Sequence, residues 1–340
     1  MYLIFAWRYF KAKKSTNAIN IIAWVTAGVI AFATCCQVLV LSVFNGFEGL
    51  VKSLYSSFYT DIRVVPAQGK TFTLTPEQIS RLRQEPAVAG LSLIAEEKAL
   101  LKNQDAQTVI YLKGVDNQYP TVSGVAEKTT QGKFNTGTAE APLVVTGAGI
   151  QNAVGINVDP ALPTSELTVI LPKRTGSMDP LESISEGNIQ PSGVFTIQQE
   201  FDDKYAITNI DFVKQQLAFQ PNEYSAVEMK LKPDADAVAA KQQLSSLLGS
   251  GYTVQSRYQQ NMNLYNTMRL EKWAIFAVLT LILIIAAFNM VSALTMLVLE
   301  KRKDISVLQS MGAGRPAIQK IFLSEGVLLG AIGAVAGILL

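Results

Sequence analysis

The stretch EKRKDISVLQSMGAGRP, residues 300–316, lies between two long apolar runs and is more detailed than a plain connection needs to be. Four apolar side chains recur in it at helical spacing: Ile305, Val307, Leu308 and Met311. Asp304 is a candidate N-cap for this short helix. Gly312 or Gly314 can end the helix, and Pro316 can open the next one. The alternative, a simple turn at the membrane surface, needs no apolar face, so we predict an amphipathic helix that docks into a groove on a partner protein.

Composition excludes several classes of function. The chain has 340 residues, a net charge of +2, no histidine and two adjacent cysteines, Cys35 and Cys36. The small net charge argues against nucleic acid as a partner. The missing histidine excludes Ser/His/Asp and Cys/His nucleophiles, and neither a P-loop nor metal-ligand spacing occurs. We therefore expect no catalytic residue, bound cofactor or metal site in this chain, and any ATP-driven work would have to be done by a separate subunit.

Three apolar blocks predict membrane helices at residues 20–44, 273–299 and 321–340. Each block has about 20 residues or more, which is enough to cross a hydrocarbon core of about 30 Å. The third block contains glycines at four-residue or near four-residue spacing: Gly326, Gly330, Gly333 and Gly337. Small residues at such spacing predict close approach of another helix.

Basic residues near the blocks predict the orientation. Residues 1–19 are basic, with apolar residues at helical spacing, so we expect an amphipathic segment on the cytoplasmic membrane surface. The connection 300–320 is also rich in Lys and Arg, and the positive-inside rule places it in the cytoplasm. Residues 45–272 then face the periplasm of a multi-pass protein in a bacterial inner membrane. Three crossings leave the last residue outside, so we expect a longer protein with a fourth helix.

The periplasmic part is predicted to be an α+β domain, which makes the chain an α+β membrane protein. A β-α-β-β pattern at about residues 60–118 and a strand-helix-strand pattern at about 222–258 suggest the two halves of a split βαβ domain. A β-rich insertion at about residues 120–220 separates the halves. Its acidic neighbours Asp202 and Asp203, like Glu96 and Glu97 in the first half, are expected on solvated faces.

A segment of 22 residues, 172–193, contains three prolines and is flanked by two predicted strands. It is either a solvent-exposed loop without a role or a long hairpin arm with a function. Under the second interpretation its candidate binding residues are Pro172, Lys173, Arg174, Met178 and Pro180.

The stretch 300–326 resembles the coupling segment of the ABC permease family that includes the lipoprotein-releasing permeases, the efflux protein MacB and the cell-division protein FtsX. The resemblance extends over the whole chain in the order helix, large outer domain, helix, coupling segment, helix. Within the family, the sequence NGFE at 45–48 and the strand YLKGVD at 111–116 are most similar to the lipoprotein-releasing (LolC/LolE) subunits.

This resemblance implies an ABC transporter in which two copies of a cytoplasmic ATPase subunit bind ATP and Mg. A second permease subunit, a lipoprotein substrate and a periplasmic lipoprotein carrier complete the system, which works by mechanotransmission. The ATPase-coupling residues would be Glu300, Lys303, Asp304, Ile305, Val307, Leu308, Met311 and Gly312. The hairpin arm would bind the carrier.

Lipid is a further expected partner. Lifting acyl chains out of a bilayer costs about 0.8 kcal/mol for each exposed CH₂, so an apolar shelter is needed. Candidate residues for this cavity are Val40, Val43, Phe44, Phe47 and Phe276, although ordinary helix packing or lipid contact also explains apolar residues there. Two alternative functions remain within the family: an FtsX-like regulator of a cell-wall hydrolase and a MacB-like efflux permease.

Overall fold

The computed structural model describes residues 17–159, 165–173 and 184–340. The chain forms two compact units, which we call the helical unit (Met1–Gly49 and Asn266–Leu340) and the sheet unit (Leu50–Tyr265). Most of the predicted N-terminal amphipathic segment lies outside the described residues.

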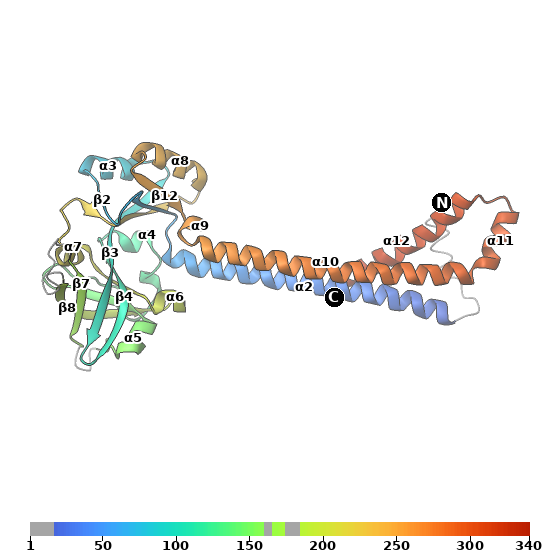
Figure 1. Ribbon diagram of the computed structural model, residues 1–340, viewed down its shortest axis with the longest axis horizontal. Helices are drawn as coiled ribbons and strands as arrows, with labels where there is room; N and C mark the ends of the chain where they lie inside the picture. Colours follow the sequence, from blue (N-terminus) through green and yellow to red (C-terminus); the bar gives the residue numbers. More distant parts are fainter. Residues whose placement is uncertain (1–16, 160–164, 174–183) are drawn as a thin grey trace. The chain divides into compact units, whose positions relative to one another are not determined.

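From residue 17 onward the helical unit is built on long helices and a short one, which Figure 1 labels. These are α2 (Asn17–Phe58), α10 (Met262–Glu300), α11 (Arg302–Ser310) and α12 (Arg315–Leu339). In the part of the chain that the structure describes, α2, α10 and α12 are long and apolar enough to cross a membrane, by length and composition. They correspond to the three apolar blocks.

All three helices are longer than the apolar blocks from which they were predicted. We expected the first to end near residue 44, but α2 continues to Phe58 despite Gly46 and Gly49. Its last turns belong to the sheet unit, where Val51, Tyr55 and Phe58 are buried on one face. Burying three such side chains contributes several kcal/mol, which exceeds the cost of about 1 kcal/mol for each helical glycine.

Glycines bring α12 close to both other long helices, as predicted. A Cβ atom at Gly333 would lie 2.8 Å from the carbonyl oxygen of Ala27 on α2. One at Gly326 would lie 2.6 Å from a methyl group of Leu294 on α10. Gly337 is equally crowded against Ala31. At Gly333 and Gly337 the backbones of α12 and α2 meet because α12 has no side chain there, and at Gly326 the missing side chain makes room for Leu294.

The sheet unit contains a ten-stranded sheet with the order β12-β1-β11-β3-β4-β9-β6-β8-β5, and β7 pairs with β3 and β8. Its strands are β1 (Ile62–Pro66), β3 (Val88–Asn103), β4 (Ala106–Val115), β5 (Thr129–Gly132), β6 (Leu143–Gly147), β7 (Leu167–Pro172), β8 (Ile184–Phe195), β9 (Tyr205–Asn209), β11 (Ala226–Leu231) and β12 (Tyr252–Ser256). A separate pair joins β2 (Phe72–Thr73) to β10 (Glu223–Tyr224).

The two predicted halves share this sheet, because β1 pairs with both β11 and β12, and β11 pairs with β3. The strands of the insertion extend the same sheet, starting where β9 runs parallel to β4 with Tyr205 beside Tyr111. The strands of the predicted insertion at about residues 120–220 therefore belong to the same sheet as the two halves, and helices lie between them. The sheet unit's helical segments are α3 (Pro76–Gln84), α4 (Tyr119–Val122), η1 (Ala126–Lys128), α5 (Ala148–Val154), α6 (Gln199–Asp202), α7 (Ile210–Leu217), α8 (Ala237–Leu248) and α9 (Arg257–Gln260).

Local signals explain these elements. Thr75 caps α3 with a complete capping box that includes Gln78, and a proline follows the cap. Helix α7 can lie on β4 because Gly114 has no side chain, since a Cβ atom there would be 2.8 Å from Val213. The apolar core of the sheet unit lies between the sheet and helices such as α7 and α8.

Candidate functional site

The predicted coupling helix exists as α11, but its cap differs from the prediction. Lys301, not Asp304, is the N-cap residue, and Asp304 lies in the first turn, 3.5 Å from the Lys301 ammonium. The helix ends at Ser310 with Met311 as its C-cap residue, and Gly312 follows in a left-handed conformation with φ of +93°. Gly314 then caps α12, with Pro316 in its first turn.

The apolar side chains of α11 fall into two groups. Ile305 and Leu308 are half-buried within the helical unit. Val307 and Met311, four positions apart and so on one helix face, are 59% and 79% exposed. The surface available to a partner is therefore formed by Val307 and Met311, flanked by the exposed charged residue Lys303. Glu300 is the last residue of α10 rather than part of α11.

The predicted lipid cavity is only partly assembled. Phe276 on α10 lines a groove in the helical unit together with Leu41 and Asn45 of α2. The other predicted residues lie along α2 but do not line that groove: Val40, Val43, Phe44 and Phe47. Val43 is 71% exposed.

The predicted arm, residues 172–193, starts at the last residue of β7 and ends inside β8, which begins at Ile184. Strands β7 and β8 form an antiparallel hairpin in which Pro172 pairs with Ile184. Lys173 is exposed at its end. The other candidate carrier-binding residues lie outside the described residues: Arg174, Met178 and Pro180.

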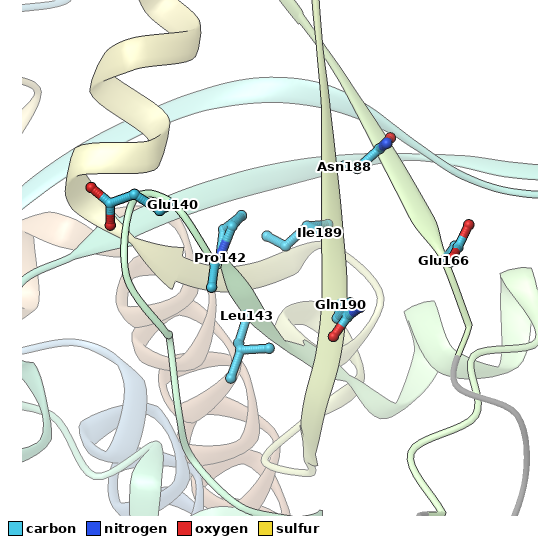
Figure 2. Close-up of a pocket in the computed structure, with 8 residues that line it drawn as sticks. Glu140, Pro142, Leu143, Glu166, Asn188, Ile189 and Gln190 are labelled. Atoms are coloured by element: carbon cyan, nitrogen blue, oxygen red, sulfur yellow. The ribbon is translucent and has the colours of Figure 1, made fainter.

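A cavity of about 390 Å³ lies beside this hairpin. Figure 2 shows Pro142, Leu143 and Ile189 near its centre, with Glu140 and Glu166 on opposite sides. The two carboxylates do not face each other, so they are not arranged for paired acid-base chemistry. Within residues 17–159, 165–173 and 184–340, no group of His, Cys, Asp or Glu side chains could hold a metal ion.

A buried cluster of charges in the sheet unit was not predicted. The ammonium of Lys113 on β4 is 2.8 Å from the carboxylate of Glu228 on β11, and both side chains are almost fully buried. Arg63 on β1 contacts Glu228 at 3.6 Å and Glu96 on β3 at 3.1 Å. Burial alone would lower the pKa of Lys113, but the adjacent carboxylate of Glu228 raises it, so the lysine stays charged.

Aromatic rings of the last turn of α2 cover this cluster. The Lys113 ammonium lies 5.0 Å from the ring centre of Phe58 and donates a hydrogen bond to the Tyr119 hydroxyl at 3.2 Å. Phe58 also stacks on Phe201, and the Tyr55 hydroxyl donates to Glu200 at 2.6 Å. The last turn of α2 is therefore fixed in the sheet unit by charge, ring and hydrogen-bond contacts together.

Two expectations about acidic residues are wrong. Glu96 belongs to the buried cluster, and the Asp202 carboxylate is buried where it accepts the Ile197 backbone N–H at 3.0 Å. Burial raises the pKa of Asp202 above its usual value. Strand alternation placed Lys113 and Glu96 correctly in strands. Their partners lie far away in the sequence, since Glu228 is 115 residues from Lys113 and Arg63 is 33 residues from Glu96, so local patterns do not reveal the pairs.

Comparison with known proteins gives two family matches that together cover most of the chain. Residues 23–247 match the MacB-like periplasmic core domain, and residues 276–340 match the FtsX-like permease C-terminal domain. The lipoprotein-releasing system transmembrane protein LolC of Xylella fastidiosa (strain 9a5c) is 26% identical over 98% of this chain and 78% of its own length. LolE of Haemophilus influenzae is 26% identical over 98% of this chain and 80% of its own length.

Relatives named for another activity match as well. The macrolide export ATP-binding/permease protein MacB of Neisseria gonorrhoeae is 22% identical over 91% of this chain and 48% of its own length. Among solved structures, the periplasmic region of MacB from Actinobacillus actinomycetemcomitans matches 62% of this chain with a TM-score of 0.44 and 15% identity.

Proposed function

The chain belongs to the family of ABC permeases with a MacB-like periplasmic core domain and an FtsX-like C-terminal domain, and from this premise we propose that it is the permease subunit of a lipoprotein-releasing transporter. It works with a separate ATPase subunit and a second permease subunit, and it passes lipoproteins from the inner membrane to a periplasmic carrier. One observation carries the proposal: relatives named LolC and LolE match 98% of this chain and about four-fifths of their own length.

The geometry of α11 supports a role in coupling. A short helix that presents Val307 and Met311 to solvent has the form of a helix that inserts into a groove on a cytoplasmic ATPase. It is joined directly to α10, which runs as one helix over Met262–Glu300. We propose that movement of α11 on ATP binding is transmitted along α10 to the sheet unit, which faces the periplasm.

Glycine contacts support the same mechanism. Helix α12 packs on the Leu294 side chain of α10 at Gly326 and on the backbone of α2 at Gly333 and Gly337, so displacement of α12 must displace its neighbours. Because the last turn of α2 is fixed in the sheet unit, motion of α2 would be passed to that unit.

The experiment that tests the function is reconstitution of the full-length permease subunits and ATPase in liposomes that contain a triacylated lipoprotein. We expect ATP to transfer the lipoprotein to a soluble carrier, as measured by its appearance in the supernatant. A control without ATP or with an ATPase-inactive subunit should release none.

Macrolide-type export is the second candidate, because the periplasmic core match and the MacB relatives favour it. The same liposomes distinguish the two functions. Transport of a small amphiphilic drug with the lipoprotein left in the membrane would support export and refute lipoprotein release.

A further inference from the structure

A groove of about 400 Å³ in the helical unit lies between α2 and α10. It is lined by Leu41, Asn45, Arg269, Lys272, Trp273 and Phe276. The four lining residues of α10 recur at three- and four-residue spacing, so they occupy one helix face. The indole of Trp273 meets the ring of Phe276 edge to face, and these rings with Leu41 form an apolar wall.

Two cations stand at one end of this wall, and they are not equivalent. The Lys272 ammonium donates to the Asn45 side-chain oxygen at 3.0 Å and pairs with Glu48 at 3.2 Å. The exposed Arg269 guanidinium has no hydrogen-bond or ion-pair partner among the residues that the structure describes. Arg269 therefore adds an uncompensated positive charge to the groove, with five N–H donors available.

If α10 spans a membrane with its uncharged stretch, the groove lies where that stretch begins. Residues 273–299 contain no charged side chain, and Lys272 directly precedes them. Tryptophan is enriched at this boundary, and lysine and arginine mark the headgroup layer. In a bilayer the apolar wall would thus lie beside acyl chains, and Arg269, one helical turn further along α10, would lie beside phosphates.

We propose that this groove is a binding site for one anionic phospholipid, with the headgroup phosphate on Arg269 and the first part of an acyl chain against Leu41, Trp273 and Phe276. Guanidinium binds phosphate with two parallel hydrogen bonds, and the apolar wall matches the chain. The alternative is that Arg269 only extends into the headgroup layer without binding a particular lipid. That alternative does not explain the apolar groove beside Arg269. The inference rests on membrane insertion of α2 and α10, not on lipoprotein release.

The test uses the full-length protein in lipid nanodiscs, with every tryptophan other than Trp273 replaced by phenylalanine; within residues 1–340 these are Trp7 and Trp24. Brominated phosphatidylglycerol, which is anionic, is titrated into one set of nanodiscs, and brominated phosphatidylcholine is titrated into a parallel set. Quenching of Trp273 fluorescence is measured in both. We expect half-maximal quenching at a phosphatidylglycerol fraction at least about tenfold lower than for phosphatidylcholine, since a charge-assisted pair contributes that much.

Arg269→Gln should abolish the preference, and Arg269→Lys should keep part of it, because the charge remains but the planar fork is lost. Arg315→Gln, which removes a charge at the start of α12, should leave it unchanged. Native mass spectrometry of the same variants should show one retained phosphatidylglycerol that Arg269→Gln loses. Equal quenching by both lipids, or an unchanged preference in Arg269→Gln, would overturn the proposal whether or not lipoprotein release is observed.

Discussion

At the scale of single residues, the Lys113–Glu228 pair gives the sharpest prediction. Lys113→Met leaves the buried Glu228 carboxylate with Arg63 as its remaining cation, 3.6 Å away. Removing one partner of a buried pair costs about 3–5 kcal/mol, because the other charge stays desolvated. We expect the temperature of unfolding of the purified full-length chain to fall by several degrees, as measured by near-ultraviolet circular dichroism.

The matched control is the double variant Lys113→Met/Glu228→Leu, which removes both charges and leaves Arg63 to Glu96. It should recover most of the lost stability, since replacing a buried pair with apolar residues is often close to neutral. If the double variant is as unstable as the single one, the ion pair itself is not what stabilises this part of the sheet.

This cluster also shows where prediction from sequence ends. The alternation in β4 predicted a strand correctly, but nothing local to Lys113 identifies a carboxylate that arrives from β11. The sheet register supplies that information: Arg63 lies opposite Glu228, and Glu96 lies opposite Lys113. Register depends on the whole topology, so the sequence predicted the strands but not the pairing of their buried charges.

At the scale of elements, the glycines of α12 make a prediction with an internal control. Gly333→Leu should push α12 away from α2, because even a Cβ atom at residue 333 would lie within 3.0 Å of side-chain atoms of Ile30. We expect loss of a compact full-length protein, measured as increased protease sensitivity in detergent. Gly330→Ala should be tolerated or slightly stabilising, since its nearest neighbour is the Met290 sulfur at 3.8 Å.

The exposed face of α11 gives a second prediction at this scale. Met311→Asp should lower the affinity of the ATPase subunit at least about tenfold, because removing a central apolar contact costs about 2 kcal/mol. Co-purification and permease-stimulated ATP hydrolysis measure the effect. Gln309→Asp adds the same charge to an exposed neighbour and should change little. Leu308→Asp is less informative, since Leu308 is half-buried in the helical unit itself. Unaltered stimulation in Met311→Asp would contradict the docking proposal.

Sequence patterns identified α11, α3 and the small-residue faces of α12, because each depends on local spacing and caps. They failed at the end of α2, where apolar side chains beyond the membrane block are buried by distant parts of the chain. Phe58 illustrates the cause: its helical conformation is stabilised by Phe201, which no window around residue 58 contains. Hydropathy predicts the part of a helix in lipid better than the part packed in protein.

At the scale of the whole molecule, a change in the β7–β8 hairpin should affect lipoprotein transfer without affecting ATP hydrolysis. Replacing residues 174–183 with a short Gly-Ser turn removes the arm beyond the Pro172–Ile184 pair but leaves the strands that join the sheet. We expect ATP hydrolysis by the reconstituted complex to stay near its original rate, since α11 and α12 are untouched. Lipoprotein transfer to the soluble carrier should fall at least about tenfold, because the arm is the proposed contact for that carrier.

The matched control changes a different loop, the tight connection between β3 and β4. Replacing Gln104 and Asp105 there with Gly-Ser should leave transfer normal. Full transfer by the shortened arm would show that the carrier binds elsewhere on the permease.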